Sequence, residues 1–175
     1  MKSKGMMFGC AIGGVILLGI AMLVFWGIGS YNNMVALEQS VVQSWSQVEN
    51  QYQRRADLIP NLVNTVKGYA DFEKEVLTKV TEARSKVSQF NITPEVLNDP
   101  QAFAKFQSLQ GELSGALSRL LVTVENYPQL KANENFLQLQ AQLEGTENRI
   151  SVERKKFNEV VQQYNTTIKK FPASM

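Results

Sequence analysis

The chain has 175 residues, of which 18 are Lys or Arg, 16 are Asp or Glu and none is His. The absence of histidine removes the usual general base, the commonest metal ligand and the physiological pH switch. The net charge of +2 comes from Lys2 and Lys4 alone, so the rest has no basic surplus for nucleic acid. Cys10 is the one cysteine, which excludes an intrachain disulfide and a thiolate metal site. We expect neither an enzyme nor a cofactor.

Residues 6–28 form an uncharged and strongly apolar run. At about 1.5 Å per residue, a helix of this length covers roughly the 30 Å hydrocarbon core of a bilayer. A cleaved signal peptide is the alternative, but its apolar region would be roughly 7–15 residues long and followed by a small-residue cleavage site. This run is longer and ends in Phe25-Trp26-Gly27. The sequence therefore predicts a retained transmembrane anchor over residues 1–30, with the lipid bilayer as partner.

Charge predicts the orientation of this anchor. Lys2 and Lys4 precede the span, and the first basic residues after it are Arg54 and Arg55. The positive-inside rule places the N-terminus in the cytoplasm and the remaining domain outside. Trp26 and Tyr31 are typical of the aromatic belt at a membrane–water interface and are the expected interface anchors.

Gly5, Gly9 and Gly13 repeat every four residues at the start of the span. Such small-residue spacing lets transmembrane backbones approach closely and favours association, which indicates a homo-oligomer. The competing interpretation is that glycine is simply common in membrane helices.

Residues 31–172 predict a helical bundle domain, because apolar residues recur at intervals of three and four. No strand pattern interrupts this periodicity. The expected helices cover about 31–68, 72–88, 100–126 and 134–170. The predicted fold is all-α, an N-terminal transmembrane helix followed by an antiparallel up-and-down bundle of about four long, coiled-coil-like helices.

The first helix of this domain has two candidate break points. Pro60 lies inside the apolar stripe without shifting its phase, which predicts a kink. A chain reversal is expected just beyond, where Gly68 can end the helix and Asp71 can cap the next one. A continuous helix through Gly68 is the alternative.

The later boundaries carry capping signals. Residues 88–100 form the expected main loop, in which Asp99 ahead of Pro100 predicts a helix start. The third helix should stop at Tyr127-Pro128, because a residue before proline is biased away from the helix. Asn133 is the expected cap of the last helix. Glu153 occupies a position in the apolar stripe of that helix, where it lies either in the core or at an outward edge.

Five stretches of the sequence form a recognisable signature: Trp45–Gln51 with Arg54–Val63, Tyr127–Phe136, Glu147–Ile150, and Tyr164-Asn165 ahead of Phe171-Pro172. In this order they resemble the LemA family. The resemblance implies a bacterial membrane protein with one N-terminal span and an up-and-down four-helix bundle. It does not imply an enzyme, because the family has no established activity. We expect the span to lie in the inner (cytoplasmic) membrane. One branch of the family takes part in forming magnetosome membranes, which points to membrane shaping. Relatives usually carry an apolar tail after the Phe-Pro pair, whereas Ala173-Ser174-Met175 follows it here.

A dense polar cluster on the first bundle helix is the candidate interaction face. The candidate residues are Arg54, Arg55, Asp57, Asn61 and Asn64, with Glu147 and Arg149 from the last helix. Spacing allows an Arg54–Asp57 ion pair. One interpretation is a solvated face with cross-helix hydrogen bonds that fix the register of the bundle, and the other is a surface for a protein partner.

These features support two functional hypotheses. The first is a membrane-anchored, self-associating helical scaffold that organises or remodels the bacterial envelope membrane. The second is a monomeric envelope adaptor that docks another envelope protein through the Arg54–Asn64 face. The mass of the assembly separates them, because only the scaffold requires many copies.

Overall fold

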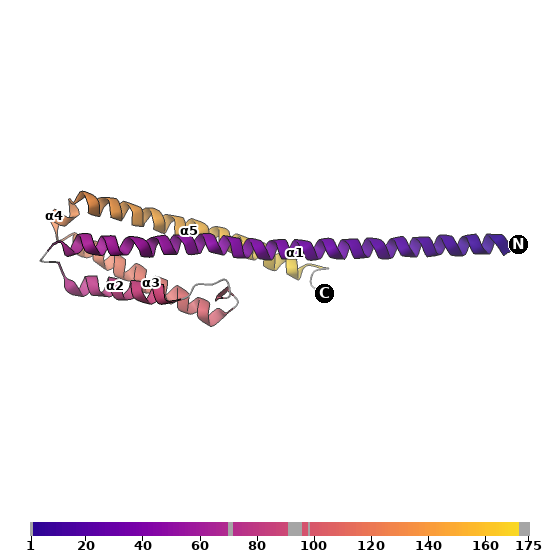
Figure 1. The fold of residues 1–175 in the computed structure, drawn as a ribbon, viewed down its shortest axis with the longest axis horizontal. Coiled ribbons are helices and arrows are strands. Elements are labelled where there is room, and N and C mark those ends of the chain that lie inside the picture. The colour runs from indigo at the N-terminus through magenta and orange to yellow at the C-terminus, as the bar shows by residue number, and fades with distance from the viewer. Residues whose placement is uncertain (1, 70–71, 91–95, 98, 172–175) are drawn as a thin grey trace. The chain divides into compact units, whose positions relative to one another are not determined.

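The computed structural model describes the backbone of residues 2–69, 72–90, 96–97 and 99–171, and side chains from residue 13 onward within these ranges. Its helices are α1 (Lys2–Lys67), α2 (Lys74–Gln89), α3 (Pro100–Val124), α4 (Pro128–Lys131) and α5 (Glu134–Lys169) (Figure 1). No strand occurs in the described ranges. The fold is therefore all-helical with one long apolar N-terminal helix, as the sequence predicts.

The chain divides into two compact units. The terminal unit comprises Met1–Val41 and Asn158–Met175, and the packed unit comprises Val42–Phe157. The sequence predicts an anchor over residues 1–30 and a bundle helix from about residue 31. The backbone is helical without a break from one to the other, as the single helix α1. Gly27 and Gly29 do not end it, since one glycine costs a helix only about 1 kcal/mol.

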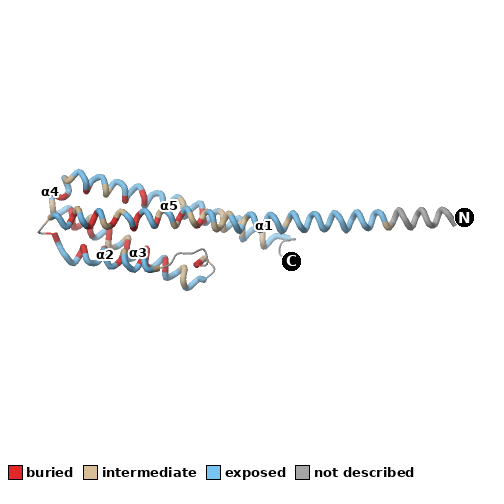
Figure 2. The backbone as a smooth tube through the Cα atoms, viewed as in Figure 1, coloured by how far each residue is buried: buried red, intermediate tan, exposed pale blue. Residues whose placement is uncertain are grey.

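The apolar part of α1 has no protein cover. One helix of the described chain is long and apolar enough to cross a membrane, and none of its most apolar window is buried. Figure 2 shows this part of α1 as exposed except at its first described residue, Gly13, which is intermediate. Large apolar side chains are exposed along it: Val15, Ile16, Leu17, Leu18, Ile20, Met22, Leu23, Val24, Phe25 and Ile28.

In the packed unit, α1 has one buried face and keeps Pro60 within the helix. The helix ends at Lys67, so it does not continue through Gly68. The next helix, α2, begins at Lys74 with Glu73 as its N-cap residue, and the Glu73 side chain makes no capping bond. The predicted cap, Asp71, lies outside the described residues.

Helices α3 and α5 begin at the caps that the sequence predicts. Asp99 accepts hydrogen bonds from the backbone N–H groups of Gln101 and Ala102 at 2.8 and 3.1 Å. The Asn133 side chain accepts one from the N–H of Phe136 at 3.0 Å. These bonds satisfy donors that a helix start otherwise leaves unpaired.

The connection between α3 and α5 differs from the prediction. Helix α3 ends at Val124 rather than at Tyr127-Pro128, and a short helix, α4, starts at Pro128. Proline suits the first turn of a helix, because its fixed backbone angle is helical and its missing N–H is not needed there. Pro128 therefore starts a helix, where the sequence pattern predicted only a stop.

The core of the packed unit draws side chains from every helix of Figure 1. The largest fully buried ones are Phe136, Ile59, Leu62, Leu113, Leu120, Leu130, Val48, Val66, Val76 and Val80. An aromatic group adds to this core around Trp45. The ring of Trp45 lies 5.7, 5.6 and 5.2 Å from the rings of Phe103, Phe106 and Phe157, measured between centroids. These contacts join α1, α3 and α5.

Candidate functional site

A buried arginine, Arg55, is the most unusual polar residue of the packed unit. It is 2% exposed, and it lies on the inward face of α1 because buried Tyr52 and Ile59 precede and follow it by three and four residues. Removing a charge from water costs several kcal/mol unless polar partners replace the water. The neighbouring helices supply these partners.

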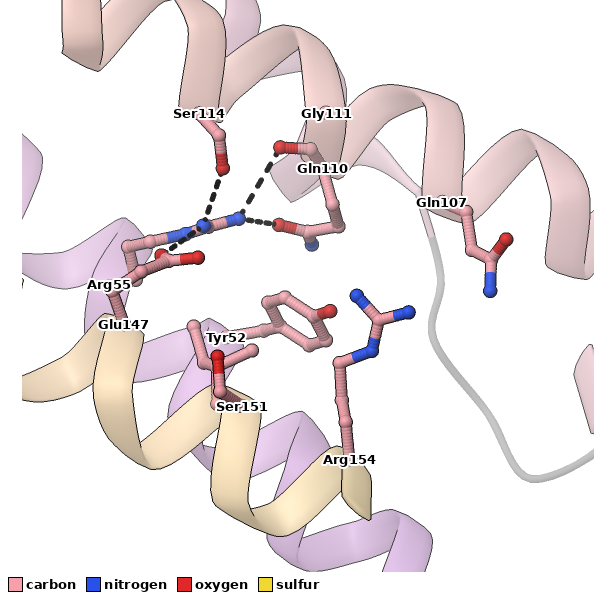
Figure 3. Close-up of a pocket in the computed structure, with 10 residues that line it drawn as sticks. Tyr52, Arg55, Gln107, Gln110, Gly111, Ser114, Glu147, Ser151 and Arg154 are labelled. Atoms are coloured by element: carbon pink, nitrogen blue, oxygen red, sulfur yellow. Dashed lines mark hydrogen bonds and ion pairs between the residues drawn. The ribbon is translucent and has the colours of Figure 1, made fainter. Parts of the chain in front are cut away.

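The guanidinium of Arg55 donates to oxygen atoms from two other helices (Figure 3). Its Nη1 donates to Ser114 Oγ at 2.8 Å and to Glu147 Oε2 at 2.7 Å. Its Nη2 donates to the side-chain oxygen of Gln110 and, at 3.5 Å, to the backbone carbonyl of the same residue. The guanidinium carbon also lies 5.3 Å from the centre of the Tyr52 ring. Arg55 therefore connects α1, α3 and α5.

A pocket of about 320 Å³ opens beside this cluster. Its lining residues are Tyr52, Arg55, Gln107, Gln110, Gly111, Ser114, Glu147, Ile150, Ser151 and Arg154 (Figure 3). A smaller hollow of about 220 Å³ also borders Arg55 and Glu147 and is more apolar, with Leu117, Leu121 and Leu143 in its wall. We refer to the first of these as the Arg55 pocket.

The two partners of the ion pair in the Arg55 pocket differ in solvent exposure. The side chain of Arg55 is 3% exposed, whereas that of its partner Glu147 is 54% exposed. Solvent screens the carboxylate, so this pair contributes less than a fully buried pair would. Burial raises the pKa of Tyr52, and the positive charges of Arg154 and Arg55 oppose that shift. The phenol is therefore kept neutral.

The predicted interaction face is only partly a surface. Arg54, Asp57, Asn61 and Asn64 are exposed, and their spacing of three, four and three places them on one stripe of α1. Arg55 does not belong to this stripe, because it points inward. Asp57 accepts a hydrogen bond from Gln53 Nε2 at 2.9 Å, not from Arg54 as the spacing predicts.

The two candidate residues on the last helix, α5, lie in different environments. Glu147 meets Arg55, while Arg149 is exposed and does not line the Arg55 pocket. Glu153 is half-buried and bonds to Lys156 at 2.8 Å, which places it at the edge of the stripe rather than in the core.

The predicted membrane-facing residues lie on α1. Gly5 and Gly9 fall where the structure describes the backbone alone. A Cβ atom added at Gly13 would have no neighbour within 4 Å among the described residues. Trp26 and Tyr31 are 51% and 64% exposed, so both are free to contact a surrounding medium.

Sequence reasoning missed Tyr52, Gln110, Ser114 and Arg154 as members of one site. Gln110 is 5% exposed, and the available signal was its spacing of four residues from Phe106 and three from Leu113, which places it on the same face of α3. No signal along the chain joined α3 to Arg154 on α5, because that proximity depends on tertiary structure. Among the described residues, no three acidic or cysteine side chains gather closely enough to hold a metal ion.

These features define an all-helical, membrane-associated protein in which one apolar helix continues into a packed helical unit. The family model described as "LemA family" matches residues 44–175. The chain therefore belongs to the LemA family, which confirms the resemblance seen in the sequence.

Three relatives illustrate the range of this similarity. The protein LemA of Metamycoplasma hominis is 25% identical, over 89% of this chain and 67% of its own length. A magnetosome protein MamQ of Magnetospirillum gryphiswaldense is 26% identical, over 81% of this chain and 58% of its own. A MamQ protein of Paramagnetospirillum magneticum is 24% identical with the same coverage. The chain thus spans little more than half the length of the MamQ relatives.

Proposed function

We propose that this protein is a membrane-anchored, self-associating scaffold that organises or remodels the bacterial envelope membrane. The observation that carries the proposal is the uncovered apolar part of α1, which is uncharged from Gly13 to Leu37 and has no buried residue in its most apolar window. Exposing so many apolar side chains to water would be strongly unfavourable, whereas lipid covers them without cost.

The proposed scaffold unit is an antiparallel up-and-down bundle. Contacts along α1 support this arrangement. From Trp45 to Arg55, the partners on α3 advance from Phe103 to Ser114. Over the same interval the partners on α5 run backwards along the sequence, from Phe157 to Glu147. Helix α3 would then run in the direction of α1, and α5 would run against it.

Helix α2 fits the same arrangement. Its residue Arg84 donates to the carbonyl oxygen of Ala56 on α1 at 2.9 Å, and Lys86 pairs with Glu112 on α3. The ring of Phe72, just before α2, lies 5.0 Å from that of Tyr127, just after α3. Along this pair of helices, contacts from earlier residues of α2 reach later residues of α3. An antiparallel pair has this order of contacts.

The proposed location is the inner membrane, with the N-terminus in the cytoplasm and the packed unit outside. The two N-terminal lysines support this orientation through the positive-inside rule. Trp26 and Tyr31 would lie at the outer interface. The magnetosome proteins among the relatives support a role in membrane organisation.

Self-association would use the glycine face of the span. A Cβ atom added at Gly13 has no neighbour within 4 Å among the described residues, so an effect of Gly13→Leu on assembly would point to contact between copies. We expect full-length protein in mild detergent to form a discrete assembly larger than a dimer, measured by light scattering. Gly13→Leu should reduce its mass.

Gly14→Leu is the matched control, because Gly14 is equally open and lies about 140° around the helix from the middle of the glycine face. This control should leave the mass unchanged. A strictly monomeric wild-type protein would contradict the scaffold.

The adaptor remains the second proposal, and one observation favours it. Arg54, Asp57, Asn61 and Asn64 are all exposed on one stripe, which leaves them available to another envelope protein. Arg54→Glu should then abolish capture of a specific partner without changing helicity, while Lys105→Glu, at an exposed site on α3, should not. Equal capture by both variants would contradict the adaptor. Arg55 is unsuitable for this test, because it is buried.

A further inference from the structure

Arg55 occupies four of the hydrogen-bond acceptors around the Arg55 pocket. Arg55 donates hydrogen bonds to Ser114 Oγ, to Glu147 Oε2 and to both oxygens of Gln110. Arginine has donors and no acceptor, so the amide oxygen of Gln110 must face it and the amide nitrogen must point away. The donors of the lining that remain for a ligand include the amide nitrogen of Gln110 and the guanidinium of Arg154.

The amide nitrogen of Gln110 is the clearest of these donors. It is buried and has no hydrogen-bond partner in the described part of the chain. A buried amide that lacks a partner costs about 1–3 kcal/mol. Gln110 lines the Arg55 pocket, so a group that enters the pocket and reaches this nitrogen after a small rotation of the amide would recover that free energy.

Arg154 supplies the charge. It is exposed on α5, and Figure 3 shows its guanidinium reaching toward the phenol of Tyr52 from the opposite side of the pocket to Gln110. Within the described residues, no carboxylate forms an ion pair with it. Arg55 and Glu147 offset each other, so the lining carries one net positive charge.

The size and the walls restrict the ligand further. A volume of about 320 Å³ is at the small end of the range for small-molecule sites, about 300–1,000 Å³. Ile150 and the ring of Tyr52 give the pocket an apolar wall. A single negative charge matches the lining, whereas a doubly charged phosphate would face repulsion from the Glu147 carboxylate.

We propose that the Arg55 pocket binds a carboxylate group that carries an apolar body. Arg154 and the amide nitrogen of Gln110 donate to the carboxylate oxygens, and the apolar body lies against Ile150. The carboxylate belongs either to a small organic acid or to the C-terminus of a peptide. This site is independent of the scaffold proposal, because it requires neither self-association nor a membrane-shaping role.

Calorimetric titration of the full-length protein in lipid nanodiscs tests the ligand class. The probes are hexanoate, the peptide acetyl-Ala-Ala-Leu with a free carboxylate, the same peptide as its C-terminal amide, and inorganic phosphate. We expect hexanoate or the free peptide to bind, which identifies the source, and the amide to be inert. Binding of phosphate alone, or of no carboxylate probe at millimolar concentrations, would overturn the proposal.

Two variants test the assigned residues. Arg154→Gln, at an exposed position, should weaken carboxylate binding about tenfold or more, which is the contribution of one charge-assisted hydrogen bond. Gln110→Glu keeps an acceptor for Arg55 but replaces the free donor, and should cause a similar loss. Arg149→Gln removes the same charge from the same helix outside the pocket and should change nothing. If Arg149→Gln weakens binding as much as Arg154→Gln, the effect is general electrostatics and the assignment is wrong.

Discussion

Residues 13–30 and residues 45–66 belong to the same helix, α1, and differ in what covers their apolar side chains. In the first stretch the large apolar residues are exposed, for example Leu18 at 71% and Phe25 at 76%. In the second, Val48, Leu62 and Val66 are fully buried. Secondary structure is identical, so the helix itself does not decide burial.

The distribution of polar residues explains the difference. Residues 13–30 are apolar on every side, which is typical of a helix surrounded by lipid. Residues 45–66 alternate a buried face with an exposed stripe that contains Arg54, Asp57 and Asn61. One helix thus carries two patterns, each suited to a different surrounding medium.

The largest effect is expected in the packed core. Phe136 is 1% exposed, and Phe136→Ala should lower the free energy of unfolding by about 3–5 kcal/mol, through lost burial and the cavity left behind. Its neighbour Leu137 is 48% exposed, so Leu137→Ala should change stability by less than about 0.5 kcal/mol. Chemical denaturation followed by circular dichroism measures both. Equal effects would contradict the assigned core.

The second prediction concerns the apolar stretch. Leu18 and Val122 are almost equally exposed, at 71% and 70%, but only Leu18 is assigned to lipid. Leu18→Arg should cost membrane insertion about 2.5–3.5 kcal/mol and move protein from the membrane to the soluble fraction, with the thermal stability of the packed unit unchanged. Val122→Arg should do neither. The fraction recovered in membranes after flotation measures the effect, and equal behaviour would remove the distinction.

The third prediction concerns Arg55. Arg55→Leu should lower the free energy of unfolding by about 1.5–3 kcal/mol, because Ser114 and Gln110 lose a charged donor. The half-exposed Glu147 returns to water and limits the loss. Arg54→Leu, at the exposed neighbouring position, should change stability by less than about 0.5 kcal/mol. If both variants lose the same stability, Arg55 is not the inward residue.

The smallest predicted effect is on the stability of the fold at alkaline pH. Burial raises the pKa of Tyr52 from its ordinary value of 10.0, so above pH 10 the folded protein holds a proton that the unfolded chain releases. The stability from this group is complete below pH 10 and falls as the pH rises through the higher folded pKa. Tyr52→Phe should therefore lose less stability above pH 10 than the wild type, as measured by thermal unfolding across that range. An identical pH profile would contradict the buried environment of the phenol.

The sequence was most informative where one local rule decides the outcome. The capping side chains of Asp99 and Asn133 act on the next few residues, so their roles could be predicted. The apolar run of α1 could be predicted from its composition and length alone. The short helix at Pro128 was missed because proline can either stop or start a helix, and the choice depends on the residues on its C-terminal side.

The candidate site was predicted less well. Arg55 was grouped with Arg54 because both are charged, although its helical phase matches buried Tyr52 and Ile59. The position of Arg55 in the helical repeat predicts its burial better than its charge does. The approach of Gln110 and Arg154 to Arg55 could not be predicted, because it depends on how α3 and α5 pack against α1 in three dimensions.

The environment of α1 can be measured directly with spin labels in lipid bilayers. Cys10 is replaced by serine, and a label is attached at position 18 or at position 57, which is exposed on the polar stripe. The label at 18 should collide readily with oxygen and rarely with a water-soluble nickel complex, since oxygen concentrates in lipid. The label at 57 should show the reverse. Ready access of the nickel complex to position 18 would contradict the claim that this part of α1 lies in a membrane.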